Sequence, residues 1–346
     1  MNNKQKEIIM NKLSKLGVSA LCGSLAAISA ANAGDLTATG GATVTWLSEE
    51  GATTGNPIGM ASAVSFKGSG ELDNGWNVAL TIGGNDAGAY SATNIIITLP
   101  GMGDIRIDQG ASGTGIARYD DNTPSVYEEA DGAGIGSGMD KVLGVNTGTT
   151  IEITPSEVMP AGLTAHFAYS KDADSGNTSD KVAGGASNEL GSGWDITLEA
   201  GSDLTGVDGL TLYGGISEYE QYQNSGSKNG DGSEQVFGVK YASGGFTVGY
   251  QRSDEETGET GTTDYQNTMY SVTFNVNDDL SIGYNHAESD ESGAGNPTAE
   301  ADSLQAAYTM GGATISFAEV DIKNRAYSTA AGADVSGHVI SLGLAF

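Results

Sequence analysis

The chain has 346 residues, 38% of them hydrophobic, and no internal apolar run reaches the roughly 18 residues that a membrane-spanning helix needs. Its 15 basic and 44 acidic residues give a formal net charge of −29, which repels polyanions, so we exclude nucleic acid as a partner. Glycine is frequent (53 residues) and proline is rare (6 residues), a balance typical of many strands joined by turns.

The N-terminal 33 residues have the three parts of a secretory signal peptide. A basic region is followed by a short apolar core at 16–27 and by Ala31-Asn32-Ala33, an A-x-A cleavage site. We therefore expect a signal peptide at 1–33 and one barrel domain at 34–346, with either Met1 or Met10 as the initiator. A membrane anchor is the disfavoured alternative, because the core is short and no stop-transfer pattern follows.

Removal of this signal changes the chemistry of the chain in two ways. Cys22, the only cysteine, is lost with it, so the exported protein needs no disulfide. Four lysines and one glutamate are lost as well, which leaves 11 basic against 43 acidic residues. Most of these acids are expected to lie in solvated loops.

After the signal, the dominant period of the sequence is two. In the first copy an apolar or small series, Leu36, Ala38, Gly40, Ala42, Val44 and Trp46, alternates with Thr37, Thr39, Gly41, Thr43 and Thr45. Such alternation predicts a strand with an apolar face and a polar face. Large aromatic residues recur near the expected strand ends, as interfacial girdles require: Trp46, Trp76, Trp194, Tyr241, Phe246 and Tyr250.

The pattern predicts 16 strands, and tight turns alternate with long polar loops between them. This alternation favours an all-β, transmembrane antiparallel β-barrel, and an even number of strands agrees with it. Residues 181–190 are an alternative to the eighth strand. The expected strands are 36–47, 58–70, 76–84, 90–99, 103–109, 145–154, 163–170, 193–204, 210–219, 234–242, 246–253, 267–276, 280–287, 302–310, 313–322 and 335–346.

The sequence offers no catalytic group and no metal or cofactor site. His166, His286 and His338 are the only histidines, and none has metal-ligand spacing or lies beside a nucleophile motif. Acidic runs such as Asp254-Glu255-Glu256 could bind divalent cations, but a solvated loop is the favoured interpretation. We therefore expect neither an enzyme nor a bound cofactor.

The C-terminal residues form a closing strand that ends on an aromatic residue. Ile340, Leu342, Leu344 and Phe346 alternate with smaller or polar residues. This ending resembles the assembly signal that the barrel-insertion machinery reads in outer-membrane barrels, with Leu342, Leu344 and Phe346 as its main positions. An ordinary closing strand is the alternative.

Residues 34–346 resemble, in pattern and layout, the general porins of alphaproteobacteria, which are trimeric barrels of 16 strands. In that family a long third loop folds into the barrel and narrows it. Here the corresponding connection is 110–144, which lacks the Pro-Glu-Phe-Gly-Gly motif of enteric porins. The resemblance implies that its acidic residues line a constriction: Asp120, Asp121, Glu128, Glu129 and Asp131.

The same resemblance implies basic residues on the opposite wall. Lys67, Arg106 and Lys240 each lie between two residues of the opposite face, so strand parity predicts that they face the lumen. A charge on the lipid face would cost about 2–4 kcal/mol at the membrane midplane. The alternative is that Lys67 and Arg106 pair with loop carboxylates in a purely structural role.

These features predict a porin in the outer membrane of a Gram-negative bacterium. Its water-filled channel would pass ions and small hydrophilic solutes by passive diffusion, with a moderate preference for cations. The expected partners are two further copies in a homotrimer, the lipid bilayer and lipopolysaccharide, the barrel-assembly machinery, and the solutes themselves. A plugged barrel with a structural or adhesive role is the alternative.

Overall fold

The computed structural model describes residues 33–50, 55–85, 90–109, 113–173, 190–221, 230–258, 264–292 and 295–345. The predicted signal peptide up to residue 32 and the terminal Phe346 lie outside these ranges. No helix within them is long and apolar enough to cross a membrane.

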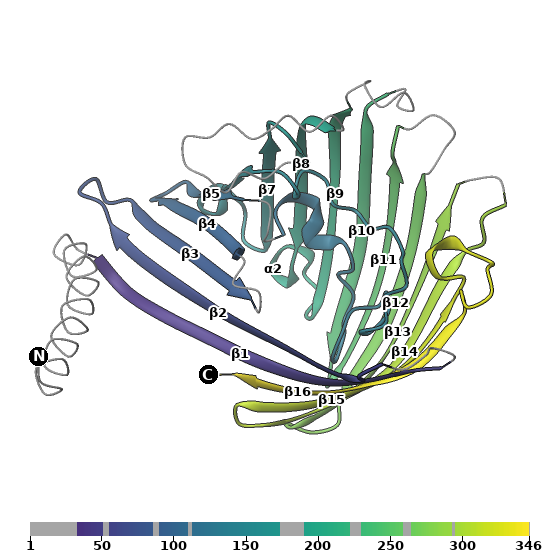
Figure 1. The fold of residues 1–346 in the computed structure, drawn as a ribbon. Coiled ribbons are helices and arrows are strands. Elements are labelled where there is room, and N and C mark those ends of the chain that lie inside the picture. Colours follow the sequence, from purple (N-terminus) through teal and green to yellow (C-terminus); the bar gives the residue numbers. More distant parts are fainter. Residues whose placement is uncertain are drawn as a thin grey trace, which may run out of the picture.

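The chain forms one closed barrel of 16 antiparallel strands, as predicted (Figure 1). Each strand pairs with its neighbours in sequence, and β1 pairs with β16 to close the ring. The strands are β1 Ala33–Glu49, β2 Ile58–Glu71, β3 Asn77–Asn85, β4 Tyr90–Leu99, β5 Gly103–Asp108, β6 Thr150–Thr154, β7 Leu163–Ser170, β8 Leu190–Ala200, β9 Leu210–Gln221, β10 Gly232–Ser243, β11 Phe246–Glu256, β12 Tyr265–Asn275, β13 Leu280–Glu291, β14 Ala299–Met310, β15 Ala313–Lys323 and β16 Val335–Ala345.

Several strands run a few residues longer than predicted, and two differ in other ways. The strand expected at 145–154 begins only at Thr150, because the Val145 N–H turns to the Asp195 carboxylate, 3.3 Å away, instead of joining the sheet. The strand expected at 193–204 ends at Ala200 and is followed by the one-turn helix α2, Ser202–Thr205. Gly206 ends this turn with φ 70°, a left-handed conformation that suits glycine.

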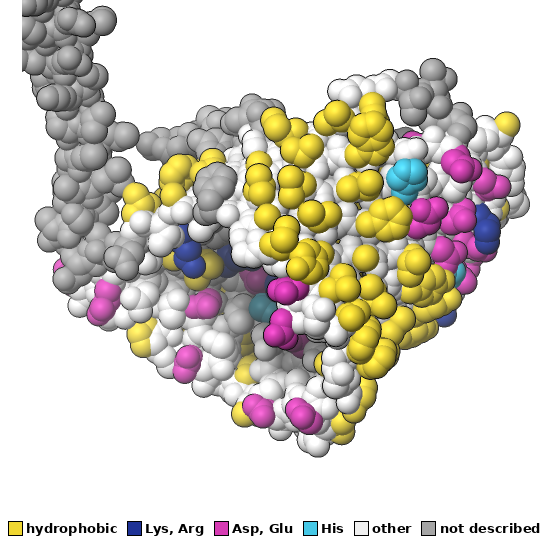
Figure 2. Space-filling model, turned by 90° about the horizontal axis from the view of Figure 1, so that it is seen from below, with side chains coloured by type: hydrophobic (Ala, Val, Ile, Leu, Met, Phe, Trp, Pro, Cys, Tyr) yellow, Lys and Arg dark blue, Asp and Glu magenta, His cyan; other side chains and the backbone are white. Residues whose placement is uncertain are grey.

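The two faces of the wall have opposite chemistry. On β13, Ile282 and Tyr284 are exposed, whereas Asn285 is fully buried. The same alternation leaves the inner face of the barrel polar and its outer face apolar, and Figure 2 shows hydrophobic side chains gathered over the outside of the wall. A barrel that is apolar outside and polar inside is suited to a lipid environment.

The C-terminal strand completes this wall. Leu342 pairs with Val44 of β1 and with Ile315 of β15, and Leu344 pairs with Ala42 and Ala313. Leu342 and Leu344 are both exposed on the outer face. Their position explains why the last strand matters for closing the ring, since without it β1 and β15 would both have free edges.

Candidate functional site: a loop on the inner wall

The connection between β5 and β6 lies along the inner face of the barrel (Figure 1). It contains a short 3-10 helix, η1 Gly115–Tyr119, whose Ile116 is fully buried. Ile116 and Tyr119 cluster with Tyr213 of β9. Further along, the loop buries Ala130, Ala133, Ile135 and Met139 against the β12–β16 wall. The described part of this loop, 113–149, is therefore packed onto the wall at both ends of its course.

Inward-facing carboxylates of the wall hold the loop backbone. The Gly115 N–H donates to Glu152 Oε2 at 2.8 Å, and the Ile116 N–H donates to Asp195 Oδ2 at 2.9 Å. On the returning half, the Gly144 N–H donates to Glu234 Oε2, also at 2.8 Å. Gly115 has φ 59°, and a Cβ there would lie 1.8 Å from Asp195 Oδ2, so this approach requires glycine. These hydrogen bonds from backbone N–H groups to carboxyl oxygens of the wall fix the two ends of the loop.

Two glutamines hold the middle of the loop. Gln251 Oε1 accepts the Asn122 N–H at 3.0 Å, and its Nε2 donates to the Tyr119 carbonyl at 2.8 Å. Gln305 Oε1 lies within 3.3 Å of three successive N–H groups, the nearest being that of Tyr127 at 2.9 Å. Both glutamines are almost completely buried, at 1% exposure. The loop backbone is thus paired with side chains of the wall, as buried peptide groups require.

The acidic residues expected to line the constriction lie in two settings. Asp120, Asp121 and Asp131 surround one cation, Lys141, with Nζ–carboxylate distances of 3.5, 2.5 and 3.1 Å. Burial and the neighbouring Asp120 raise the pKa of Asp121 to about 7. Burial alone would lower the pKa of Lys141, but Asp131 and Asp121 raise it above its usual value. This cluster carries three acids for one base and keeps a negative excess.

Glu128 and Glu129 form the second setting. Within the described residues neither carboxylate makes an ion pair, and the side chain of Glu129 is exposed. The Glu128 carbonyl accepts from Asn285 Nδ2 at 3.1 Å and from Gln305 Nε2 at 2.9 Å, so its backbone is fixed to the wall. Burial and the adjacent Glu129 raise the pKa of Glu128 to about 7. Glu128 is therefore an acidic group that is held by its backbone and whose charge depends on pH.

The three basic wall candidates occupy different environments. Lys67 is exposed on β2, at the parity opposite to the outward-facing Phe66. Arg106 on β5 pairs with Asp108, with Nη2 2.9 Å from Oδ2. Lys240 on β10 contacts the loop directly, with Nζ 2.5 Å from Asn122 Oδ1. The structure therefore brings Lys240 to the loop, whereas Arg106 has a carboxylate of its own strand beside it.

Sequence reasoning missed a polar cluster behind the loop. Arg118 pairs with Glu152 of β6, and His166 of β7 lies 3.6 Å from the same carboxyl group. Thr154 Oγ1 is 2.8 Å from His166 Nδ1, the same ring nitrogen that faces Glu152. An acyl-transfer triad uses both ring nitrogens, whereas here Nδ1 makes both contacts. Parity was the available signal, because Glu152 lies between the outward-facing Ile151 and Ile153.

The described residues contain no group of three or more histidine, cysteine, aspartate or glutamate side chains that could hold a metal ion. The site therefore offers fixed charges and hydrogen bonds along an inner wall. Such an arrangement can select among diffusing solutes by size and charge.

No family model and no curated protein matches the sequence. Solved structures do. An anion-selective porin from Comamonas acidovorans has a TM-score of 0.65 at 13% identity, over 90% of this chain and 99% of that one. A Salmonella typhi OmpF complex with daunomycin has a TM-score of 0.64 at 13% identity, over 90% and 97%. A Rhodopseudomonas blastica porin mutant has a TM-score of 0.57 at 15% identity, over 90% of this chain and 100% of that one.

These matches span nearly the whole of each solved chain, and their low identity shows that the likeness lies in the fold. The shared features are the closed ring and the antiparallel order of its 16 strands. The chain has the general porin fold.

Proposed function

We propose that this protein is an outer-membrane porin that passes ions and small hydrophilic solutes by diffusion and prefers cations. The observation that carries the proposal is the loop on the inner wall. Its described part contains six acidic and two basic residues, and it is hydrogen-bonded to wall side chains on β6, β8, β10, β11 and β14. A polar loop held rigidly inside a barrel narrows the pore but leaves it open to water.

The expected selectivity follows from the charges that remain after pairing. Lys141 offsets part of the Asp120, Asp121 and Asp131 charge, whereas Glu128 and Glu129 form no ion pair with a basic side chain of the described residues. Lys67 and Arg106 oppose this field from the β2 and β5 wall. Charges in a narrow passage act at short range, so they matter more than acids in outer loops, which salt screens beyond about 8 Å. We therefore expect a moderate cation preference.

The test is a recording from the purified protein in planar bilayers. Stepwise conductance is expected, followed by a zero-current potential of cationic sign across a salt gradient. The variant Glu128→Gln/Glu129→Gln should lower that potential. A matched control is Glu157→Gln/Asp203→Asn, which removes the same charge from two exposed sites in the tight turns.

Each outcome has a distinct meaning. A protein that inserts without conducting would support the plugged structural or adhesive barrel instead. An anion-selective parent would overturn the electrostatic part of the proposal. A cation-selective parent that the Glu128/Glu129 variant leaves unchanged would move the selectivity to the outer loops.

The remaining expectations concern assembly. We propose export with cleavage after Ala33, insertion by the barrel-assembly machinery, contact with lipopolysaccharide, and association into a homotrimer, as the resemblance to trimeric porins implies. N-terminal sequencing of membrane-extracted protein would reject the cleavage site if residues before Gly34 were found. Chemical cross-linking in outer membranes should give a ladder that stops at three copies.

A further inference from the structure

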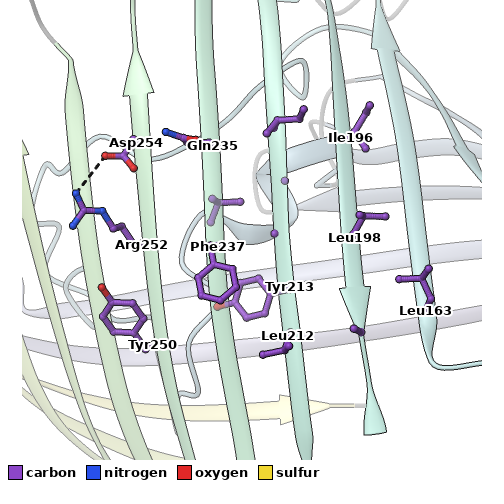
Figure 3. A pocket seen from close by; sticks show the side chains of 15 residues that line it. Leu163, Ile196, Leu198, Leu212, Tyr213, Gln235, Phe237, Tyr250, Arg252 and Asp254 are labelled. Atoms are coloured by element: carbon purple, nitrogen blue, oxygen red, sulfur yellow. Dashed lines mark ion pairs between the residues drawn. The ribbon is translucent and has the colours of Figure 1, made fainter. Parts of the chain in front are cut away.

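A cavity of about 480 Å³ lies at the long-loop end of the barrel, where two loops meet the wall. The apolar trough that crosses β7–β11 (Figure 3) is a separate feature with other lining residues. The cavity is lined by the β5–β6 loop, by the ends of β12 and β13, and by the β15–β16 loop, chiefly through Met139, Asp140, Tyr265, Glu291 and Tyr327. Its size is that of a site for a small molecule.

The register of the sheet places this cavity on the inner side of the wall. Tyr265 has the same parity as Asn267 and Met269 of β12. Asn267 Nδ2 donates to the Asp140 carbonyl at 2.9 Å, and Met269 packs against the loop, so this face of β12 points inward. Tyr265 pairs directly with Glu291 of β13, which therefore lies beside it on the same face.

Two tyrosine rings form an aromatic wall of the cavity. The ring centroids of Tyr265 and Tyr327 are 5.4 Å apart, at an interplanar angle of 42°. Tyr327 is fixed there, because its hydroxyl oxygen accepts the Asp140 N–H at 2.8 Å and lies 2.7 Å from Ser289 Oγ. The rings are thus held in position by the protein itself, which lowers the cost of ordering them around a ligand.

The charge around these rings is negative. Asp140 and Glu291 line the cavity, and Glu255 of β11 pairs with Tyr265 from the other side. Oε2 of Glu255 is buried and has no hydrogen-bond partner among the described residues. Burial, together with the negative charge of Asp140 and Glu291, raises the pKa of Tyr327. The aromatic wall therefore faces several carboxyl groups.

The bases next to these carboxyl groups in the two loops have other partners. Lys141 contacts the three aspartates of the constriction loop, and Nη1 of Arg325 lies 3.5 Å from Glu49 Oε1. In the described ranges the acids do not converge into a group that could hold a metal ion. Separated carboxylates beside aromatic rings suit a bulky, weakly hydrated cation, because a small hard ion requires several oxygen ligands at one point.

We propose that this cavity binds the quaternary ammonium group of a small organic cation. The methyl groups would lie against Tyr265 and Tyr327, and Asp140 and Glu291 would balance the charge. A quaternary ammonium group has no N–H to donate, so the negative faces of aromatic rings supply its attraction. The inference deepens the proposed function and rests on it in one respect: only in a pore would this site collect such cations at the mouth. Binding itself does not require conduction.

The test is isothermal titration calorimetry of the full-length exported protein in detergent. The probes are choline chloride and its uncharged isostere, in which a tert-butyl group replaces the trimethylammonium group. The parent should bind choline about tenfold more tightly than the isostere, as expected for a desolvated cation–π contact. It should also bind tetramethylammonium more tightly than ammonium. Equal affinity for choline and the isostere, or tighter binding of ammonium, would overturn the proposal without any variant.

Tyr265 offers a matched pair of substitutions. Tyr265→Leu removes the ring and should weaken choline binding about tenfold, whereas Tyr265→Phe keeps the ring and should bind like the parent. Heat-modifiability of both variants confirms that the barrel is folded. Equal affinities of the folded leucine and phenylalanine variants would show that the ring does not contribute, and the site would be rejected.

The carboxyl groups offer a second pair. Glu291→Gln should weaken choline binding about threefold, as expected for one partly exposed ion pair, and leave the isostere unchanged. Glu256→Gln removes the same charge from an exposed position with the opposite parity to Glu255 on β11, and should have no effect. Equal losses in both variants would reduce the effect to net charge and overturn the site. Conductance of the same samples separates the two proposals: a conducting parent that does not bind choline overturns only this inference, and a binding parent that does not conduct overturns only the porin.

Discussion

The Nζ of Lys141 lies 2.5 Å from Oδ2 of Asp121, and the two residues come from opposite arms of the loop on the inner wall. Oδ2 of Asp131 lies 3.1 Å from the same Nζ. The loop is therefore fastened to itself by charge as well as to the wall by hydrogen bonds. Lys141 also sets how much of the negative charge of the loop acts on a passing ion.

Lys141→Gln should increase the preference for cations. The substitution removes the only basic partner that the described residues offer to three carboxylates, and the passage then gains net negative charge. The measurement is the zero-current potential across a salt gradient. Lys323→Gln, on the outer face of β15, is the control and should leave the potential unchanged. A lower potential in the Lys141 variant would show that the loop collapses instead of keeping its place.

Cation preference should rise with pH, with a midpoint close to 7. The pKa values of Asp121 and Glu128 are both raised to about 7, chiefly by burial, so both groups are neutral at pH 5 and charged at pH 9. Zero-current potentials between pH 5 and 9 would show the transition. Glu128→Gln should reduce its amplitude, whereas Glu157→Gln in an exposed turn should not. A flat profile in the parent would refute the titration.

The raised pKa values of Asp121 and Glu128 also predict that the loop is held more firmly at low pH. A carboxyl group whose pKa is raised on folding stabilises the folded form fully below its ordinary pKa, near 4.5 for Glu128, and this contribution is lost as the pH rises through about 7. Current noise from loop motion should therefore grow between pH 5 and pH 9. Fluctuations that are largest at pH 5 would contradict this sign.

Deletion of Phe346 should impair assembly of the barrel. The residue lies outside the described part of the chain, but it directly follows a strand in which Ala345 pairs with Gly41 of β1. The readout is the yield of folded, heat-modifiable barrel in outer membranes. Phe346→Tyr keeps the terminal aromatic ring and should restore the yield. Equal yields from the parent and the deletion would count against the assembly signal.

Strand parity explains why the barrel was predictable from sequence. The alternation around Trp46 or Phe317 reports directly which face each residue occupies, and tight turns fix where each hairpin begins. The shortened β6 was not predictable, because its late start depends on Asp195, a residue of a distant strand that accepts the Val145 N–H. Local patterns do not contain such long-range competition.

The candidate site was predictable only as a set of residue types. The acids of the loop were visible, but an irregular segment has no period that would place Lys141 among Asp120, Asp121 and Asp131. The role of Gln305 was equally hidden, because a polar residue with inward parity predicts only a side chain that faces water inside the barrel. Its value as an anchor depends on the path of a loop nearly 180 residues away in sequence. Packing of the loop, not local propensity, makes that contact.

Gln305→Leu should loosen the middle of the loop without unfolding the barrel. The side chain accepts from the N–H groups of Val126, Tyr127 and Glu128 and donates to the Glu128 carbonyl. Leucine has similar volume but removes the acceptor of these three N–H groups, at a cost of about 2 kcal/mol, whereas the Glu128 carbonyl keeps its hydrogen bond from Asn285. The sheet keeps its backbone hydrogen bonds, so the damage falls on the segment that carries Glu128 and Glu129. Single-channel records should therefore show added flicker and a weaker cation preference at unchanged heat-modifiability.

Gln235→Leu places the same substitution on an exposed position of the outer face of β10 and should conduct like the parent. Identical records from Gln305→Leu and the parent would show that the neighbouring anchors, Gln251 and Asn285, suffice to hold the loop in place.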